Sequence, residues 1–88
     1  MSIVTMYSKL TCPYCVQAEH LLQRKGVSNL NKIRIDENPS ELETMIARTG
    51  RRSVPQIFIG DTHVGGFDDL SALNAAGKLD AMPNNQGA

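Results

Sequence analysis

Two cysteines, Cys12 and Cys15, are the residues of this chain best suited to chemistry, and the sequence contains no others. They stand between a short apolar run and a stretch with helical character, a position in which a Cys-x-x-Cys pair is typical of a redox motif. Residues three apart share one helical face, so the two thiols can close into a small disulfide ring. At a helix start, the Cys12 sulfur would face free backbone N–H groups and the positive end of the helix dipole. Both favour a thiolate, and its pKa is expected to lie well below the value of roughly 8.5 for a free cysteine.

A zinc site and a structural disulfide are the alternatives to a redox pair. Structural zinc takes about four ligands, and the remaining candidates are His20 and His63, which lack the usual His-x₃₋₅-His spacing. A disulfide that closes so small a ring would remove little entropy from the unfolded chain. We therefore favour the redox pair and expect no metal.

Length and composition predict one small domain. The chain has 88 residues, 41% of them hydrophobic, and nine basic residues balance nine acidic ones. This balance does not suggest a nucleic-acid or membrane partner. The first apolar segment is too short for a signal peptide, and no run is long enough to span a bilayer. We expect a cytoplasmic monomer in a reducing compartment, where a Cys-x-x-Cys pair is more often catalytic than structural.

The hydrophobic pattern predicts seven elements in the order strand, helix, strand, helix, strand, strand, helix. The strands are expected at residues 3–7, 32–36, 56–59 and 62–64, and the helices at 13–25, 39–49 and 68–76. The second helix carries a start pattern, with Asn38 as N-cap, Pro39 at the first position and Glu41 completing a capping box. The first strand, helix and strand predict a parallel βαβ unit. Residues 1–80 are expected to form the domain, and residues 81–88 a disordered tail.

The face of the first helix suggests different roles for the two cysteines. Cys15 shares its face with Ala18 and Leu22 and is expected to be buried, whereas Cys12 at the tip is expected to be exposed. The exposed sulfur would attack a substrate disulfide, and the buried one would resolve the mixed disulfide that results.

A second stretch with chemical content is Gly65-Gly66-Phe67-Asp68-Asp69. Its glycines allow a close approach between backbone and ligand, and its acidic residues open the last helix. One interpretation is a turn followed by an Asp N-cap. In the other, free N–H groups at the helix start hold a carboxylate while an aspartate holds an ammonium, as a small zwitterionic peptide would require.

Other charged residues remain open to interpretation. Lys9 is either a solvated loop residue or a group that stabilises the thiolate or binds a carboxylate. Adjacent arginines such as Arg51 and Arg52 are more typical of a solvated loop than of a site. We interpret His63 as an exposed strand residue without a special role.

With these motifs in place, the chain resembles the dithiol glutaredoxins over residues 3–79. Three motifs carry the resemblance in order: Thr11-Cys12-Pro13-Tyr14-Cys15, Ser53-Val54-Pro55 and Gly65-Gly66-Phe67-Asp68-Asp69. The resemblance implies a thioredoxin-like α/β fold, in which a four-stranded mixed sheet and three helices follow the order βαβαββα. It also implies a cis peptide bond between Val54 and Pro55.

The resemblance implies a glutathione-disulfide oxidoreductase with Cys12 as nucleophile and Cys15 as resolving cysteine. The expected glutathione-binding residues are Lys9, Thr11, Tyr14, Ser53, Val54, Pro55, Gly66, Phe67, Asp68 and Asp69. The Val54 backbone would pair with the cysteinyl part of glutathione, and the backbone at residues 66–68 would hold its γ-glutamyl carboxylate. Asp69 would hold the amino group, and Arg51 or Arg52 the glycyl carboxylate.

Glutathione would serve as reductant, with no tightly bound cofactor. The expected protein partners carry glutathione or a disulfide, and ribonucleotide reductase is one candidate. Two departures from the family pattern are Phe67, where many members have cysteine, and Ser53, where many have threonine.

Two other functions compete with this interpretation. A redoxin reduced by thioredoxin reductase would share the fold but lack the glutathione site, and the acidic pair at Asp68 and Asp69 argues against it. A carrier of iron–sulfur clusters would have a single active-site cysteine, whereas Cys15 gives Cys12 an oxidation partner here.

Overall fold

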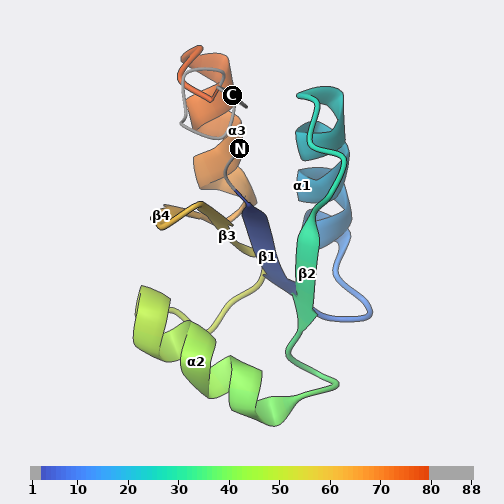
Figure 1. Ribbon diagram of the computed structural model, residues 1–88, viewed down its shortest axis with the longest axis vertical. Helices are drawn as coiled ribbons and strands as arrows, with labels where there is room; N and C mark the ends of the chain where they lie inside the picture. The colour runs from blue at the N-terminus through green and yellow to red at the C-terminus, as the bar shows by residue number, and fades with distance from the viewer. Residues whose placement is uncertain (1–2, 80–88) are drawn as a thin grey trace.

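The computed structural model describes residues 3–79, which form a four-stranded mixed sheet and three helices (Figure 1). The elements are β1 (Val4–Ser8), α1 (Pro13–Arg24), β2 (Asn31–Arg34), α2 (Pro39–Thr49), β3 (Gln56–Ile59), β4 (Thr62–Gly65) and α3 (Phe67–Ala75). The predicted order of elements is therefore confirmed. The tail predicted to be disordered, residues 81–88, lies outside the described residues. None of the helices within residues 3–79 combines the length and apolar character needed to cross a membrane.

The strand order is β2-β1-β3-β4. β1 runs parallel to β2, as the βαβ pattern predicts, and β3 is antiparallel to both β1 and β4. Helices α1 and α3 lie on one side of the sheet and α2 lies on the other (Figure 1). A short loop connects the end of β1 to the start of α1, and the two cysteines lie at that helix start.

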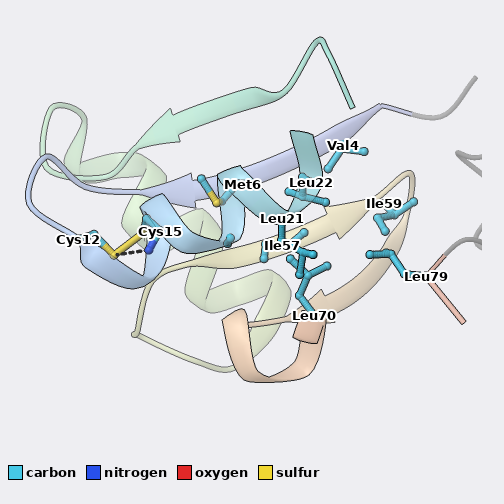
Figure 2. Packing of buried hydrophobic residues seen from close by; sticks show 11 residues of the cluster. Val4, Met6, Cys12, Cys15, Leu21, Leu22, Ile57, Ile59, Leu70 and Leu79 are labelled. Atoms are coloured by element: carbon cyan, nitrogen blue, oxygen red, sulfur yellow. Dashed lines mark hydrogen bonds between the residues drawn. A yellow bond between two sulfur atoms is a disulfide. The ribbon is translucent and has the colours of Figure 1, made fainter. Parts of the chain in front are cut away.

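Alternation along the central strands divides the core between the two faces of the sheet. Met6 and Ile57 face α1 and α3, whereas Tyr7 and Phe58 pack with Met45 of α2. The larger cluster consists of Val4, Met6, Cys12, Cys15, Ala18, Leu21, Leu22, Ile57, Ile59, Leu70 and Leu79. Figure 2 shows the cysteines at one end of this cluster and Val4, Ile59 and Leu79 at the other. The cysteine pair is thus continuous with the packed core, which fixes its position.

The start of α2 differs from its predicted capping box. Asn38 is the N-cap residue and Pro39 follows it, as expected, but the Asn38 side chain makes no bond to the helix backbone. Its Oδ1 instead accepts a hydrogen bond of 2.8 Å from the Ser40 hydroxyl. The capping-box prediction is wrong because this nearer hydroxyl takes up the asparagine oxygen. The helix ends as expected at Gly50, whose φ of 73° is left-handed.

Strand β2 ends before Asp36, which the sequence analysis placed inside the strand. The Asp36 carboxylate accepts two hydrogen bonds from Arg34, at 2.7 and 2.8 Å, and a third of 3.1 Å from the backbone N–H of Leu10. Leu10 belongs to the loop that precedes Cys12. Asp36 therefore ties the end of β2 to the loop that leads into the cysteine motif.

Replacing Asp36 with asparagine is expected to lower stability in a pH-dependent manner. The hydrogen bonds from Arg34 lower the pKa of Asp36 well below its usual range. A lowered pKa in the folded state contributes stability above the unfolded pKa of roughly 4, and this contribution is lost as the pH falls through the lower folded value. The difference in urea midpoint between wild type and Asp36→Asn should therefore be largest at neutral pH and shrink in acid. Glu43→Gln, on the exposed face of α2, is the control, and a difference that does not change with pH would contradict the assignment.

Candidate active site

The cysteine pair forms a disulfide at the start of α1, with its Cα atoms 5.2 Å apart. Cys12 is the N-cap residue and has an extended backbone, and Pro13 follows at the first helical position. The backbone N–H of Cys15 donates a hydrogen bond of 3.2 Å to the Cys12 sulfur (Figure 2). The Cys12 sulfur therefore occupies the place of a capping oxygen, where an N–H group and the helix dipole stabilise negative charge.

The predicted contrast in exposure between the two cysteines is wrong. Cys12 is 7% exposed and Cys15 is 4% exposed, so both are buried. Both belong to the larger core cluster, against which Val54 packs, and the Val54 carbonyl oxygen lies 3.9 Å from the Cys12 sulfur. Cys12 therefore differs from Cys15 in its N-cap position and not in its exposure.

A cavity of about 280 Å³ is lined in part by Val54, whose carbonyl oxygen lies 3.9 Å from the Cys12 sulfur, and we call this cavity the cradle. It is lined by Tyr14, Arg51, Ser53, Val54, Pro55, Gln56, Gly66, Phe67, Asp68 and Asp69. The rings of Tyr14 and Phe67 are stacked, with centroids 6.1 Å apart. Residues from the start of α1, the loop before β3 and the start of α3 thus meet at one place. The Val54–Pro55 peptide bond within the cradle is cis, as the resemblance implied.

The start of α3 supplies the polar end of the cradle. Gly66 is its N-cap, so the N–H groups of Phe67 and Asp68 have no carbonyl partner within the helix. Asp69 reaches back to accept a hydrogen bond of 2.9 Å from the Gly66 N–H and another of 3.0 Å from Arg51. These two bonds lower the pKa of Asp69, and the bond from Arg51 has the larger effect. Both fall on Oδ2, which leaves Oδ1 without a hydrogen bond among the described residues.

Gly65 has no side chain because Asp69 occupies the space where its Cβ would lie. A Cβ built on Gly65 would overlap the Asp69 carboxylate, at 2.7 Å from Cγ, and the φ of Gly65 is +119°. Gly65→Ala is therefore expected both to destabilise the fold and to displace the Asp69 side chain. Chemical denaturation and NMR of the Gly66 amide would measure both effects. Gly26→Ala, at a positive φ but with open space around its Cβ, is the matched control for backbone strain alone.

The structure distinguishes between the two adjacent arginines. Arg51 lines the cradle and contacts Asp69, whereas Arg52 is exposed and does not line it. Sequence reasoning left this choice open, because both arginines lie in the same loop. Arg51 lines the cradle because Asp69, in the first turn of α3, lies within contact distance of its guanidinium.

Two of the expected binding residues lie outside the cradle. Lys9 lines a second cavity of about 180 Å³, on which both cysteines also border. Thr11 is exposed and lines neither cavity. The other expected residues, from Tyr14 to Asp69, all line the cradle.

The prediction that His63 is exposed is also wrong. His63 is half-buried, and its Nε2 lies 2.8 Å from Oε1 of Gln56. Gln56 lines the cradle, although sequence reasoning assigned it only to a strand. A glutamine in an otherwise apolar strand is the one sequence feature that indicates this contact.

The geometry offers no clustered ligands for the zinc alternative. Within residues 3–79, no three His, Cys, Asp or Glu side chains come together in a way that would hold a metal ion. What the arrangement provides is a sulfur that a helix N-terminus stabilises, a second sulfur within bonding distance, and a cradle with charged groups at one end. Such a site can exchange disulfides with a small polar thiol.

Comparison with known proteins gives consistent matches. Residues 4–64 match the family model for glutaredoxin. The chain is 50% identical to a glutaredoxin of Neisseria meningitidis serogroup B, covering 96% of this chain and 99% of the relative. It is 52% identical to glutaredoxin 3 of Escherichia coli K12, covering 93% of this chain and 98% of the relative.

Solved structures agree in fold. A buckwheat glutaredoxin–glutathione complex matches with a TM-score of 0.86 and 30% identity, covering 99% of this chain and 81% of that one. The solution structure of a Brucella melitensis glutaredoxin matches with a TM-score of 0.79 and 48% identity, covering 92% and 87%. The thioredoxin-like arrangement expected from the sequence is confirmed.

Proposed function

Because this chain belongs to the glutaredoxin family and is a thiol–disulfide oxidoreductase, we propose that glutathione is its reductant and that it reduces protein–glutathione mixed disulfides and protein disulfides. The single observation that carries this proposal is the cradle, which has charged groups at one end and includes Val54, whose carbonyl oxygen lies 3.9 Å from the sulfur that the α1 N-terminus stabilises. We place the protein in the cytoplasm, where glutathione keeps thiols reduced. Its protein substrates would be glutathionylated or disulfide-containing, with ribonucleotide reductase as one candidate.

Glutathione has the charges that the cradle complements. Its γ-glutamyl carboxylate would accept hydrogen bonds from the free N–H groups of Phe67 and Asp68. Its ammonium would contact Oδ1 of Asp69, and its glycyl carboxylate would contact Arg51. The Arg51 guanidinium already lies 3.0 Å from Oδ2 of Asp69. Its cysteinyl backbone would pair with Val54, which places the glutathione sulfur next to Cys12. Tyr14 and Phe67 would enclose the bound peptide, and Lys9 and Thr11 would contact it from the loop before Cys12.

Removal of glutathione from a protein needs only Cys12. The Cys12 thiolate attacks the glutathione sulfur, an S–S bond forms between them, and the protein thiolate leaves and takes up a proton. A second glutathione thiolate then attacks the glutathione sulfur on Cys12, releasing oxidised glutathione and restoring the Cys12 thiolate. The N–H of Cys15 stabilises that thiolate both before attack and as the leaving group.

Reduction of a protein disulfide needs both cysteines. Cys12 attacks one protein sulfur and releases the other as a thiolate. Cys15 then attacks the Cys12 sulfur, so the second protein thiolate leaves and the Cys12–Cys15 disulfide forms. That disulfide is the bond present in the structure, and two glutathione molecules reduce it as they become oxidised glutathione.

The proposed use of glutathione can be tested with two substrates that differ only in the attached thiol. One peptide is linked through its cysteine to glutathione, and the same peptide is linked to free cysteine, which lacks the γ-glutamyl and glycyl groups. Two charged contacts of about 1.5–3 kcal/mol each predict at least about a 100-fold preference in kcat/KM for the glutathione form. Equal rates would show that the cradle does not recognise glutathione.

A further inference from the structure

Gln56 is a fully buried polar side chain for which disulfide exchange has no direct use. It is 0% exposed and stands at the start of β3, directly after Pro55 of the cradle. A buried amide is costly unless its donors and acceptor find partners. The partners of Gln56 therefore indicate why a polar side chain occupies this position.

The hydrogen bonds of Gln56 link His63 of β4 to Ser53, which lines the cradle. Its Nε2 donates to the Ser53 carbonyl at 3.1 Å and lies 3.4 Å from the Ser53 hydroxyl. This contact orients the amide, so its Oε1 must accept the bond of 2.8 Å from His63. His63 consequently carries a hydrogen on Nε2. A chain of donors thus runs from β4 through β3 to the segment that presents Val54 to the Cys12 sulfur.

His63 is itself fixed from several sides. Its ring lies 5.0 Å from that of Phe58 on β3, and the guanidinium of Arg48 on α2 lies 3.8 Å from the centre of the Phe58 ring. Burial lowers the pKa of His63, with further lowering from Arg51 and Arg48 against an opposing effect of Asp69. The imidazole therefore acts as a neutral, oriented donor, and its position depends on packing between β4, β3 and α2.

We propose that Gln56 and His63 are positioning residues for the Ser53–Val54 segment, holding its backbone in the orientation that accepts the cysteinyl part of glutathione. The inference rests on the proposed function for its ligand, but the positioning itself is a property of the protein alone. Neither side chain touches the sulfurs. Loss of the contact should weaken substrate binding and leave the reactivity of Cys12 unchanged.

His63→Phe is the primary test, because it keeps a ring against Phe58 and removes the donor. Loss of one net hydrogen bond predicts a rise of about 3- to 10-fold in KM for a glutathionylated peptide, with kcat within about twofold of wild type. His63→Gln, which restores an N–H donor, should recover much of the loss. Gln56→Leu, which leaves the Ser53 carbonyl unpaired, should have a larger effect. His20→Phe, at the chain's other histidine on the exposed side of α1, is the matched control.

Hydrogen exchange of the Ser53 and Val54 amides provides a readout that does not depend on glutathione. Exchange there should be faster in His63→Phe than in wild type and return toward wild type in His63→Gln. The proposal would be overturned if His63→Phe changed neither KM nor amide exchange. It would also be overturned if His63→Phe and His63→Gln raised KM equally and both had a lower denaturation midpoint. If wild type shows no turnover with glutathione, the proposed function fails, and the exchange experiment alone decides whether the positioning holds.

Discussion

Cys12→Ser is expected to abolish all activity, whereas Cys15→Ser should keep deglutathionylation and lose reduction of protein disulfides. The reason is that the Cys12 sulfur receives an N–H hydrogen bond at the helix N-terminus, beside Val54 of the cradle, whereas the Cys15 sulfur receives none from residues 3–79. Without Cys12 there is no attacking thiolate, so turnover of either substrate should fall to the uncatalysed rate. Without Cys15, a mixed disulfide with a protein cannot be resolved internally, but glutathione can still regenerate Cys12.

This first prediction is measured with two substrates, a glutathionylated peptide and a protein with one intramolecular disulfide. Because both cysteines are almost equally buried, the assignment of roles does not follow from accessibility, and the variants test the electrostatic argument directly. Equal loss of both activities in the two variants would contradict the assignment. So would alkylation of Cys15 ahead of Cys12 in the reduced wild-type protein.

Asp69→Asn is expected to lower kcat/KM for glutathionylated substrates by about 10- to 100-fold. The change removes the charge that faces the substrate ammonium and weakens the bond to Arg51, and hydrogen bonds to charged groups are worth about 1.5–3 kcal/mol. Since the pKa of Asp69 is lowered, the wild-type carboxylate is charged at neutral pH and the substitution removes a full charge.

The loss in Asp69→Asn should appear mainly in KM and should be absent for a small disulfide that lacks the γ-glutamyl group. Asp61→Asn, an exposed carboxylate in the turn between β3 and β4, is the control. Arg51→Ala and Arg52→Ala provide a second matched pair, because only Arg51 lines the cradle. An equal effect of the two arginine variants would show that the Arg51–Asp69 contact does not shape the site.

Local sequence patterns predicted the elements well, because strong local features mark their ends. Pro13 and Pro39 begin two helices at the expected residues, and Gly50 ends the second. The strand that was placed least accurately is β2, which ends at Arg34, and the Arg34 side chain pairs with Asp36 just beyond the strand. Local spacing cannot show this arrangement, because Asp36 also accepts a hydrogen bond from the Leu10 backbone in a distant loop.

The contacts between residues of different motifs could not be predicted from the sequence. The Cys12 sulfur lies 3.9 Å from the Val54 carbonyl oxygen, although the two residues are 42 positions apart in the chain. The choice of Arg51 over Arg52 depends on the contact of Arg51 with Asp69 of α3, and the Gln56–His63 bond joins side chains of two different strands. Each of these is set by the packing of elements against one another and has no counterpart in spacing along the chain.

The most direct test that glutathione is the reductant is an assay of NADPH oxidation with a small glutathione mixed disulfide as substrate. The assay is run with two alternative sources of electrons. One reaction contains glutathione and glutathione reductase, and the other contains thioredoxin reductase alone. The cradle predicts turnover with glutathione and none with thioredoxin reductase. Turnover with thioredoxin reductase alone would contradict the account: the fold and the Cys12–Cys15 pair would stand, but the Gly66–Asp69 contact would be no more than a helix cap.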